Sequence, residues 1–258
     1  MRRIRSMVVS ALLFAVAAAL AGAGHAAEPA RIAAASDLRF AMDKIVAAFR
    51  EDHPDHPVEV IYGSSGRFRA QIENGAPFDL YFSADIAYPR MLVERGFAAT
   101  EVIRYGVGRI VLWSGTVDAT RLTLGDLTRP EFRRIAIANP SHAPYGARAR
   151  EALRTAGLWD ELEPRLVYGE NIAHAMQLVE SGAADIGIIA LALALNDNVR
   201  NRGGYYLIDD ALHQPLDQGF IITRRAAENE TARLFADYMQ APAARTVMRE
   251  YGFVLPGE

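Results

Sequence analysis

The sequence predicts an α/β protein of two lobes, each a mostly parallel sheet flanked by helices. Short apolar runs of the kind found in buried strands alternate along the chain with segments whose apolar residues recur at helical spacing. A longer apolar run over residues 105–113 interrupts this alternation, and a second cycle of strands and helices follows it. We therefore expect the chain to cross from one lobe to the other at this run.

The first 26 residues have the three zones of a secretory signal peptide. Three arginines within the first five residues precede an apolar run over residues 7–24, and the small residues ending at Ala26 form a cleavage site. A membrane anchor is the alternative, but the run is rich in alanine and ends at this site. No later stretch approaches the ~20 apolar residues that a spanning helix needs. We expect cleavage after Ala26 and a soluble protein in a bacterial periplasm.

Cysteine content and charge exclude several classes of protein. The chain has no cysteine, which excludes a disulfide scaffold and a lipid-anchored amino-terminal cysteine. Removal of the three arginines with the signal peptide would lower the net charge from −3 to −6. An acidic chain of this kind does not suit a nucleic-acid partner. Any anion that it binds must therefore be held by local dipoles rather than by the net charge.

The spacing of apolar residues places the individual elements. The expected strands cover residues 32–35, 58–62, 78–82, 134–138, 166–168, 205–208 and 219–223, with a buried and partly strand-like run over 185–195. The expected helices cover residues 38–49, 67–74, 83–92, 123–127, 147–156, 172–179, 231–239 and 243–249. A second crossing near residues 219–223 would return the chain to the first lobe. We expect residues 27–107 and 222–258 to form the first lobe, and residues 108–221 the second.

Four corners at which a strand turns into a helix suggest a binding site. The first follows Ser36, the second follows Ser64 and Ser65, the third lies in the loop over residues 139–146, and the fourth is at Asn171. Ser36 is expected to cap the helix that follows it. The first N–H groups of a helix have no partners within the helix, so each corner presents polarised donors to an anion. Two corners from each lobe predict a cleft lined with amides and hydroxyls.

The sequence shows no motif of a catalytic or metal-binding site. Ser64 and Ser65 are the best candidates for a nucleophile, but residues 63–66 do not match G-x-S-x-G and no histidine lies in a recognisable partner motif. His53 and His56 flank prolines without a third ligand nearby, so a solvated loop explains them better than a metal site. The glycine-rich segments match neither a P-loop nor a dinucleotide fingerprint. We expect neither an enzyme nor a cofactor.

Several stretches together resemble the periplasmic molybdate-binding proteins of molybdate ABC importers. They are AAAS at 33–36, YGSSG at 62–66, QIENGAPFDLYFSAD at 71–85, NPSHAPYG at 139–146 and REYGF at 249–253. The resemblance covers essentially the whole chain after the signal peptide. It implies a two-lobed, type II periplasmic-binding-protein fold and a monomer that captures molybdate, usually tungstate as well, and hands it to an inner-membrane ABC permease.

The resemblance also implies which residues hold the oxyanion. Ser36 would offer its hydroxyl and its N–H, and Ser65 its hydroxyl, with Ser64 beside it. In the second lobe the main-chain amides of Tyr145 and Ile172 would complete the shell. Molybdenum would be bound only as the oxyanion, with no direct bond from protein to metal.

Two positions depart from the family pattern. Many members donate a tyrosine hydroxyl from the strand after the fourth corner, and here that position corresponds to Ala190. Either Tyr145 or another donor compensates, or the affinity and the choice between anions differ. Asp37 is an apparent insertion of one residue beside the first corner. Its carboxylate would cap the helix favourably if it pointed away from the anion, and would repel the anion if it faced it.

Three alternatives remain open from the sequence. A receptor for sulfate, thiosulfate or phosphate would share the architecture. A secreted hydrolase would require a reactive Ser64 or Ser65. A ferric-ion receptor of similar fold would need clustered tyrosines, for which Tyr205 and Tyr206 are the nearest candidates.

Overall fold

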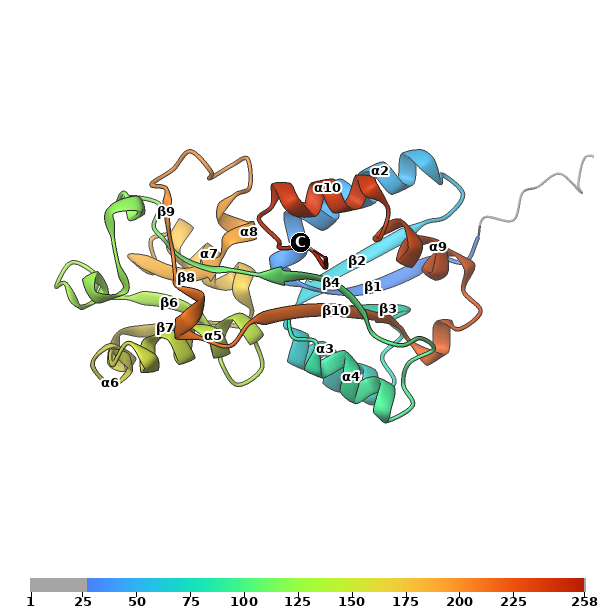
Figure 1. Cartoon of the computed structure of the whole chain (residues 1–258), viewed down its shortest axis with the longest axis horizontal. Coiled ribbons are helices and arrows are strands. Elements are labelled where there is room, and N and C mark those ends of the chain that lie inside the picture. The colour runs from blue at the N-terminus through green and yellow to red at the C-terminus, as the bar shows by residue number, and fades with distance from the viewer. Residues whose placement is uncertain (1–26, 258) are drawn as a thin grey trace, which may run out of the picture.

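The computed structural model describes residues 27–257, so the signal peptide expected over residues 1–26 lies outside the described part of the chain. Two five-stranded sheets lie side by side along the long axis of the molecule, each flanked by helices (Figure 1). No helix within residues 27–257 is long and apolar enough to cross a membrane. The expected α/β class with two sheets is confirmed.

The first sheet has the strand order β2-β1-β3-β10-β4. These strands are β1 (Ala30–Ala35), β2 (Val58–Gly63), β3 (Leu80–Ser83), β4 (Ile103–Gly108) and β10 (Leu216–Ile222). β1 runs parallel to β2 and β3, whereas β10 runs antiparallel to β3 and β4. The parallel strands therefore point their carboxyl ends to one edge of the sheet, where a ligand site is expected in an α/β fold.

Helices cover both faces of the first sheet. They are α2 (Arg39–Asp52), α3 (Ser65–Glu73), α4 (Ala87–Glu94), α9 (Glu230–Tyr238) and α10 (Pro242–Glu250). α2, α9 and α10 pack on one face, where Phe82 stacks on Phe220 with ring centroids 4.5 Å apart. α3 and α4 pack on the other face through Phe68, Ile72 and Leu92 (Figure 1). Burial of both faces explains why the strands are almost wholly apolar.

The second sheet has the strand order β7-β6-β8-β5-β9. Its strands are β5 (Ile110–Trp113), β6 (Ile135–Ala138), β7 (Leu166–Gly169), β8 (Ile186–Ala190) and β9 (Tyr205–Leu207). Its helices are α5 (Pro144–Thr155), α6 (Trp159–Leu162), α7 (Ile172–Glu180) and α8 (Leu191–Ala194). Short 3-10 turns cover Ser36–Leu38, Ala119–Arg121, Leu124–Thr128, Glu163–Arg165, Asp210–Leu212 and Arg224–Ala226. β6 is parallel to β7 and β8, so this sheet repeats the parallel core of the first.

Two connections join the sheets. The apolar run over residues 105–113 crosses as expected, because β4 ends in the first sheet at Gly108 and β5 begins in the second at Ile110. The return crossing lies earlier than expected. β10 pairs with β4 from Leu216 onward, so residues 216–221, which the sequence assigned to the second lobe, pair within the first sheet. Because the start of β10 contains polar residues, the pattern of apolar residues did not reveal this part of the strand.

The start of α5 also differs from the sequence-based expectation. Residues 144–146 were expected to lie in a loop, but they form the first turn of this helix. Pro144 is its first residue, a position that proline favours because its backbone torsion already suits a helix. A Cβ added to Gly146 would lie 2.0 Å from the carbonyl oxygen of Ala138, so only glycine lets the start of α5 approach the end of β6.

Candidate anion-binding site

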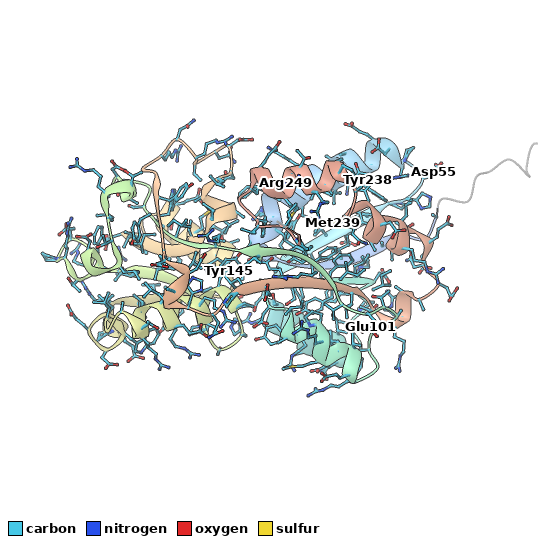
Figure 2. The ribbon with its side chains drawn as sticks, viewed as in Figure 1. Asp55, Glu101, Tyr145, Tyr238, Met239 and Arg249 are labelled. Carbon is cyan, nitrogen blue, oxygen red and sulfur yellow. The ribbon has the colours of Figure 1, made fainter. Side chains whose placement is uncertain are left out.

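A small cavity lies where the carboxyl ends of the parallel strands of both sheets meet. Its volume is about 10 Å³, close to the space that one water molecule needs. Figure 2 shows Tyr145, one of the lining residues, near the middle of the molecule between the two halves. The cavity is lined by Ala35, Ser36, Asp37, Gly63, Ser64, Ser65, Ala84, Ala143, Pro144, Tyr145, Asn171 and Ile172. Residues at the starts of helices in both lobes therefore surround this cavity.

Six of the seven residues named from the sequence line this cavity, and all six are buried. They are Ser36, Asp37, Ser64, Ser65, Tyr145 and Ile172. The seventh, Ala190, does not line it: it is the buried last residue of β8 and pairs with Ile110 of β5. Its methyl group offers no donor, so β8 contributes no hydroxyl to the cavity from this position.

Ser36 does not cap its own helix, and that expectation was wrong. It begins a 3-10 turn over Ser36–Leu38, and α2 starts only at Arg39. Its Oγ instead accepts a hydrogen bond from the Ala173 N–H at 3.2 Å and donates one to Asn171 Oδ1 at 3.0 Å. Both partners belong to the start of α7 in the second lobe. The 3-10 turn moves the hydroxyl away from α2, so it serves the helix of the opposite lobe.

Ser65 and Ser64 are neighbours whose hydroxyl groups bond to different lobes. Ser65 is the first residue of α3, and its Oγ accepts a hydrogen bond from the Ala84 N–H at 3.0 Å, within the first lobe. Tyr81 donates to the Ser65 carbonyl oxygen at 2.8 Å and holds the same corner. Ser64 Oγ donates to the carbonyl oxygen of His142 at 2.6 Å, across to the second lobe. Ser65 is therefore positioned by its own lobe alone.

No sequence motif predicts a histidine partner for these serines, but the structure supplies one. His142 Nδ1 lies 3.0 Å from Ser64 Oγ. Burial and the Arg67 guanidinium lower the pKa of His142. Among the described residues no carboxylate hydrogen-bonds to this ring, and Ser64 also donates to the His142 carbonyl oxygen, so the pair lacks the orienting acid of a nucleophilic triad.

Asp37 lies in the cavity wall as a fully buried carboxyl group. Its Oδ2 accepts hydrogen bonds from Tyr145 OH at 2.9 Å and from Gln218 Nε2 at 3.0 Å. Its Oδ1 has no hydrogen-bond partner. Burial raises the pKa of Asp37 to about 6, although the hydrogen bonds from Gln218 and Tyr145 act to lower it. Asp37 thus lines the cavity with its carboxyl group held by Tyr145 and Gln218.

Main-chain amides complete the set of donors. Ser65 and Ile172 are the first residues of α3 and α7, and Tyr145 is the second residue of α5. N–H groups at these positions have no acceptor within their own helix, and the helix dipole makes them favourable partners for an anion. Asn171 caps α7 properly, because its Oδ1 accepts from the His174 N–H at 3.0 Å.

Further contacts join the lobes around the cavity. The Gly66 N–H donates to the His142 carbonyl oxygen at 3.0 Å. At the surface, Arg67 pairs with Glu170 at 3.0 Å, and in a partly buried pair Arg148 Nη2 lies 3.6 Å from Asp85 Oδ2. The two lobes are thus in direct contact around the cavity.

Sequence reasoning did not foresee the contacts of three residues at this site. Asn171 was placed at the fourth corner, and its position as a good capping residue directly before an apolar helix was the detectable signal. His142 lies in the loop expected over residues 139–146, and no motif singled it out. Gln218 had no signal, because a polar residue inside a strand is read as facing solvent, whereas here it is fully buried.

The donor set suits an oxyanion better than a metal cation. Within residues 27–257 no group of three or more His, Cys, Asp or Glu residues could hold a metal ion. Around the cavity, hydroxyl and N–H donors outnumber the single carboxylate of Asp37. Such donors match the negative oxygens of an anion rather than the coordination needs of a cation.

Comparisons with known proteins agree with this geometry. Residues 30–254 match the family described as bacterial extracellular solute-binding protein. The molybdate-binding protein ModA of Rhodobacter capsulatus is 33% identical over 213 residues, which cover 82% of this chain and 82% of the relative. ModA of Azotobacter vinelandii is 34% identical over 254 residues, which cover 97% of this chain and 99% of the relative.

A solved structure shows the same architecture. The periplasmic molybdate-binding protein of Azotobacter vinelandii superposes with a TM-score of 0.83 at 32% identity, and the match covers 88% of this chain and 99% of that one. The two sheets, the cavity between them and these similarities point the same way: the chain belongs to the bacterial extracellular solute-binding proteins.

Proposed function

We propose that this protein captures molybdate, and tungstate as well, between its lobes and delivers it to an ABC permease in the inner membrane. Two relatives named as molybdate-binding proteins match it at 33% and 34% identity over most of the chain. The observation that carries the proposal is the convergence of hydroxyl and N–H donors from both lobes on one buried cavity. The function is transport rather than catalysis, in line with the family.

The anion would be held by neutral donors. Ser36 and Ser65 supply hydroxyl groups from the first lobe, and Tyr145 and Ile172 supply main-chain N–H groups from the second. No arginine or lysine lines the cavity, so hydrogen bonds and helix dipoles must balance the charge. Hydrogen bonds to a charged acceptor are about twice as strong as neutral ones, and a site shielded from water strengthens them further. Full coordination requires both lobes at once.

Selectivity against sulfate follows from the size of the tetrahedral anion. A smaller anion cannot reach the donors of both lobes at the same time. Each buried donor that is left without a partner costs on the order of 1–3 kcal/mol, so two or three unmet donors reject the smaller anion strongly.

Location and partners follow from the same family relationship. The relatives are extracellular or periplasmic substrate-binding proteins, which supports a periplasmic location. A signal peptide over residues 1–26 would export the chain, and the permease would recognise the lobes once they have closed on the anion. We propose a monomer that needs no cofactor and binds no nucleic acid.

Calorimetric titration with molybdate, tungstate and sulfate tests the proposal. Wild-type protein should bind molybdate and tungstate tightly and sulfate at least a hundredfold more weakly. Ser36→Ala and Ser65→Ala should each weaken molybdate binding by roughly tenfold or more, because each removes one donor. Ser181→Ala, which removes an exposed hydroxyl at the end of α7, is the matched control and should bind as the wild type does. Tight sulfate binding without molybdate binding would refute the proposal.

A further inference from the structure

Two buried oxygen atoms beside the cavity have no hydrogen-bond donor. They are Asp37 Oδ1 and Gln218 Oε1, and both side chains belong to one cluster with Tyr145. Buried acceptors without partners are uncommon in folded proteins and cost free energy. The cluster therefore calls for an explanation that an ordinary packing argument does not provide.

The hydrogen atoms available in this cluster do not reach every buried oxygen atom. The Tyr145 hydroxyl proton is used in the bond to Asp37 Oδ2. The amide nitrogen of Gln218 lies 3.0 Å from both Asp37 Oδ2 and Tyr145 OH, so one N–H group is shared between these two acceptors. Neither Asp37 Oδ1 nor Gln218 Oε1 accepts a hydrogen bond. One additional proton on Asp37 would turn an unpaired acceptor into a donor.

The surroundings of Asp37 offer no cation that could stabilise its charge. The titratable groups that face it are Tyr145 from α5 and Tyr105 from β4. Burial and the Asp37 carboxylate raise the pKa of Tyr145 well above its ordinary value, so its hydroxyl stays protonated. From β10 the neighbour is the neutral Gln218, and α8 contributes the buried apolar residues 191–194.

Charged residues on the adjoining helices are engaged elsewhere. At the start of α7, Glu170 pairs with Arg67 at the surface, and His174 Nδ1 accepts from the Glu170 N–H. On α5, Arg148 pairs with Glu151 and with Asp85. None of these groups contacts Asp37.

Resting on the proposed function, we infer that the site binds its oxyanion together with one proton, which Asp37 holds as a neutral carboxyl group in the complex. The proton comes from solvent and adds to the carboxylate, and no other bond is made or broken. Protonation removes a negative charge that would repel a dianion bound at this cavity, which Asp37 lines. It also supplies an O–H donor at the cavity wall. Asp37 is thus a residue that sets affinity through its charge.

The expected dependence on pH has a definite sign. Burial raises the pKa of Asp37 to about 6 despite the hydrogen bonds that it accepts, and a bound dianion acts in the same direction. Above pH 6 the complex therefore carries one proton more than the free protein. Affinity should fall by about tenfold for each pH unit above this value, and should level off below it.

Calorimetric titration of the protein with sodium molybdate from about pH 5.5 to about pH 8.5 tests the inference, because this range extends from just below the Asp37 pKa of about 6 to well above it. Repeating each titration in two buffers of different ionisation enthalpy gives the number of protons taken up. The wild type should take up about one proton at pH 8 and fewer toward pH 5.5. Asp37→Asn should take up none and show a flat affinity profile. Asp43→Asn removes an exposed carboxylate on α2 and should keep the wild-type slope.

The outcomes separate the two proposals. Molybdate binding by the wild type without proton uptake overturns this inference alone, and the proposed function stands. A slope that persists in Asp37→Asn places the proton on another group and also overturns the inference. If the wild type binds no molybdate at any pH, the proposed function fails and the inference fails with it. The wild-type proton count decides the matter even if Asp37→Asn does not fold.

Discussion

Two corners of the first lobe begin with a serine after a parallel strand, yet they are built differently. At the Ser65 corner (residues 64–66), the Ser65 hydroxyl accepts from Ala84 of the same lobe. At the Ser36 corner (residues 36–38), the Ser36 hydroxyl bonds only to the start of α7 in the other lobe. The Ser65 hydroxyl is therefore held within its own lobe, whereas the Ser36 hydroxyl finds its partners only when the lobes meet.

The corners also differ in charge. The Ser36 corner carries the buried Asp37, and the Ser65 corner carries Gly66, whose N–H approaches the His142 carbonyl oxygen. A donor fixed within one lobe and a donor that depends on lobe closure therefore share one cavity. Three predictions, in order of decreasing effect, test this difference.

The largest effect is expected from Asp37→Asn on the free energy of unfolding. The folded carboxyl group has the higher pKa, about 6 against 3.8, so the folded protein binds more protons than the unfolded chain between these values. Stability from this group is therefore present below pH 4, is lost as pH rises to 6, and stays lost above it. At pH 8 the variant should be more stable than the wild type by on the order of 2–3 kcal/mol.

Urea denaturation at pH 8 and at pH 4 measures this difference. The gain should nearly vanish at pH 4, because the wild-type carboxyl group is then neutral when folded. Asp43→Asn, an exposed carboxylate on the neighbouring helix, should show neither effect. Equal gains at both pH values would mean that charge is not the cause.

The second substitution, Gly66→Ala, should interfere with lobe contact at the Ser65 corner. An added Cβ would lie 2.6 Å from the His142 carbonyl oxygen, which belongs to the opposite lobe. Crowding of this kind costs roughly 1–3 kcal/mol, so molybdate affinity should fall about tenfold or more. Gly115→Ala, whose Cβ would meet only Trp113 at 3.7 Å, is the matched control for calorimetry. Undiminished affinity in Gly66→Ala would show that this contact does not limit closure.

The smallest effect is a difference between the two serines in the protein without anion. Ser65→Ala leaves the Ala84 N–H buried without an acceptor and should lower the free energy of unfolding by about 1 kcal/mol. Ser36→Ala removes only bonds between lobes, and the released Ala173 N–H can reach water when they separate, so its loss should stay below about 0.5 kcal/mol. Thermal and urea unfolding measure both. Equal losses would remove the distinction between the corners.

Much of the fold could be predicted because local patterns encode it. Apolar runs such as residues 32–35 marked the parallel strands, and the unusually long run over 105–113 marked the crossing between sheets. The change from strand to helix spacing at residue 36 located the first corner. The spacing of apolar residues, and the burial that it reflects, involve only a few neighbouring residues. A single sequence therefore carries this information.

The contacts within the site could not be predicted in the same way. The bond from Ser36 to Asn171 joins residues 135 positions apart, and the bond from Gln218 to Asp37 joins residues 181 positions apart. No local pattern encodes which side chains meet over such separations. For this reason the orientation of Asp37 stayed open, and the contacts of His142 and Gln218 were not expected. The role of the cavity residues as oxyanion ligands stays a prediction.

The bond between Ser36 Oγ and the Ala173 N–H has a practical consequence. An amide proton that depends on the opposite half for its acceptor is shielded only while the halves touch, so its rate of exchange with deuterium reports the fraction of time spent open. The His174 N–H, which bonds to Asn171 within its own helix, provides an internal reference one residue away. The ratio of these two exchange rates therefore measures lobe opening without an attached label.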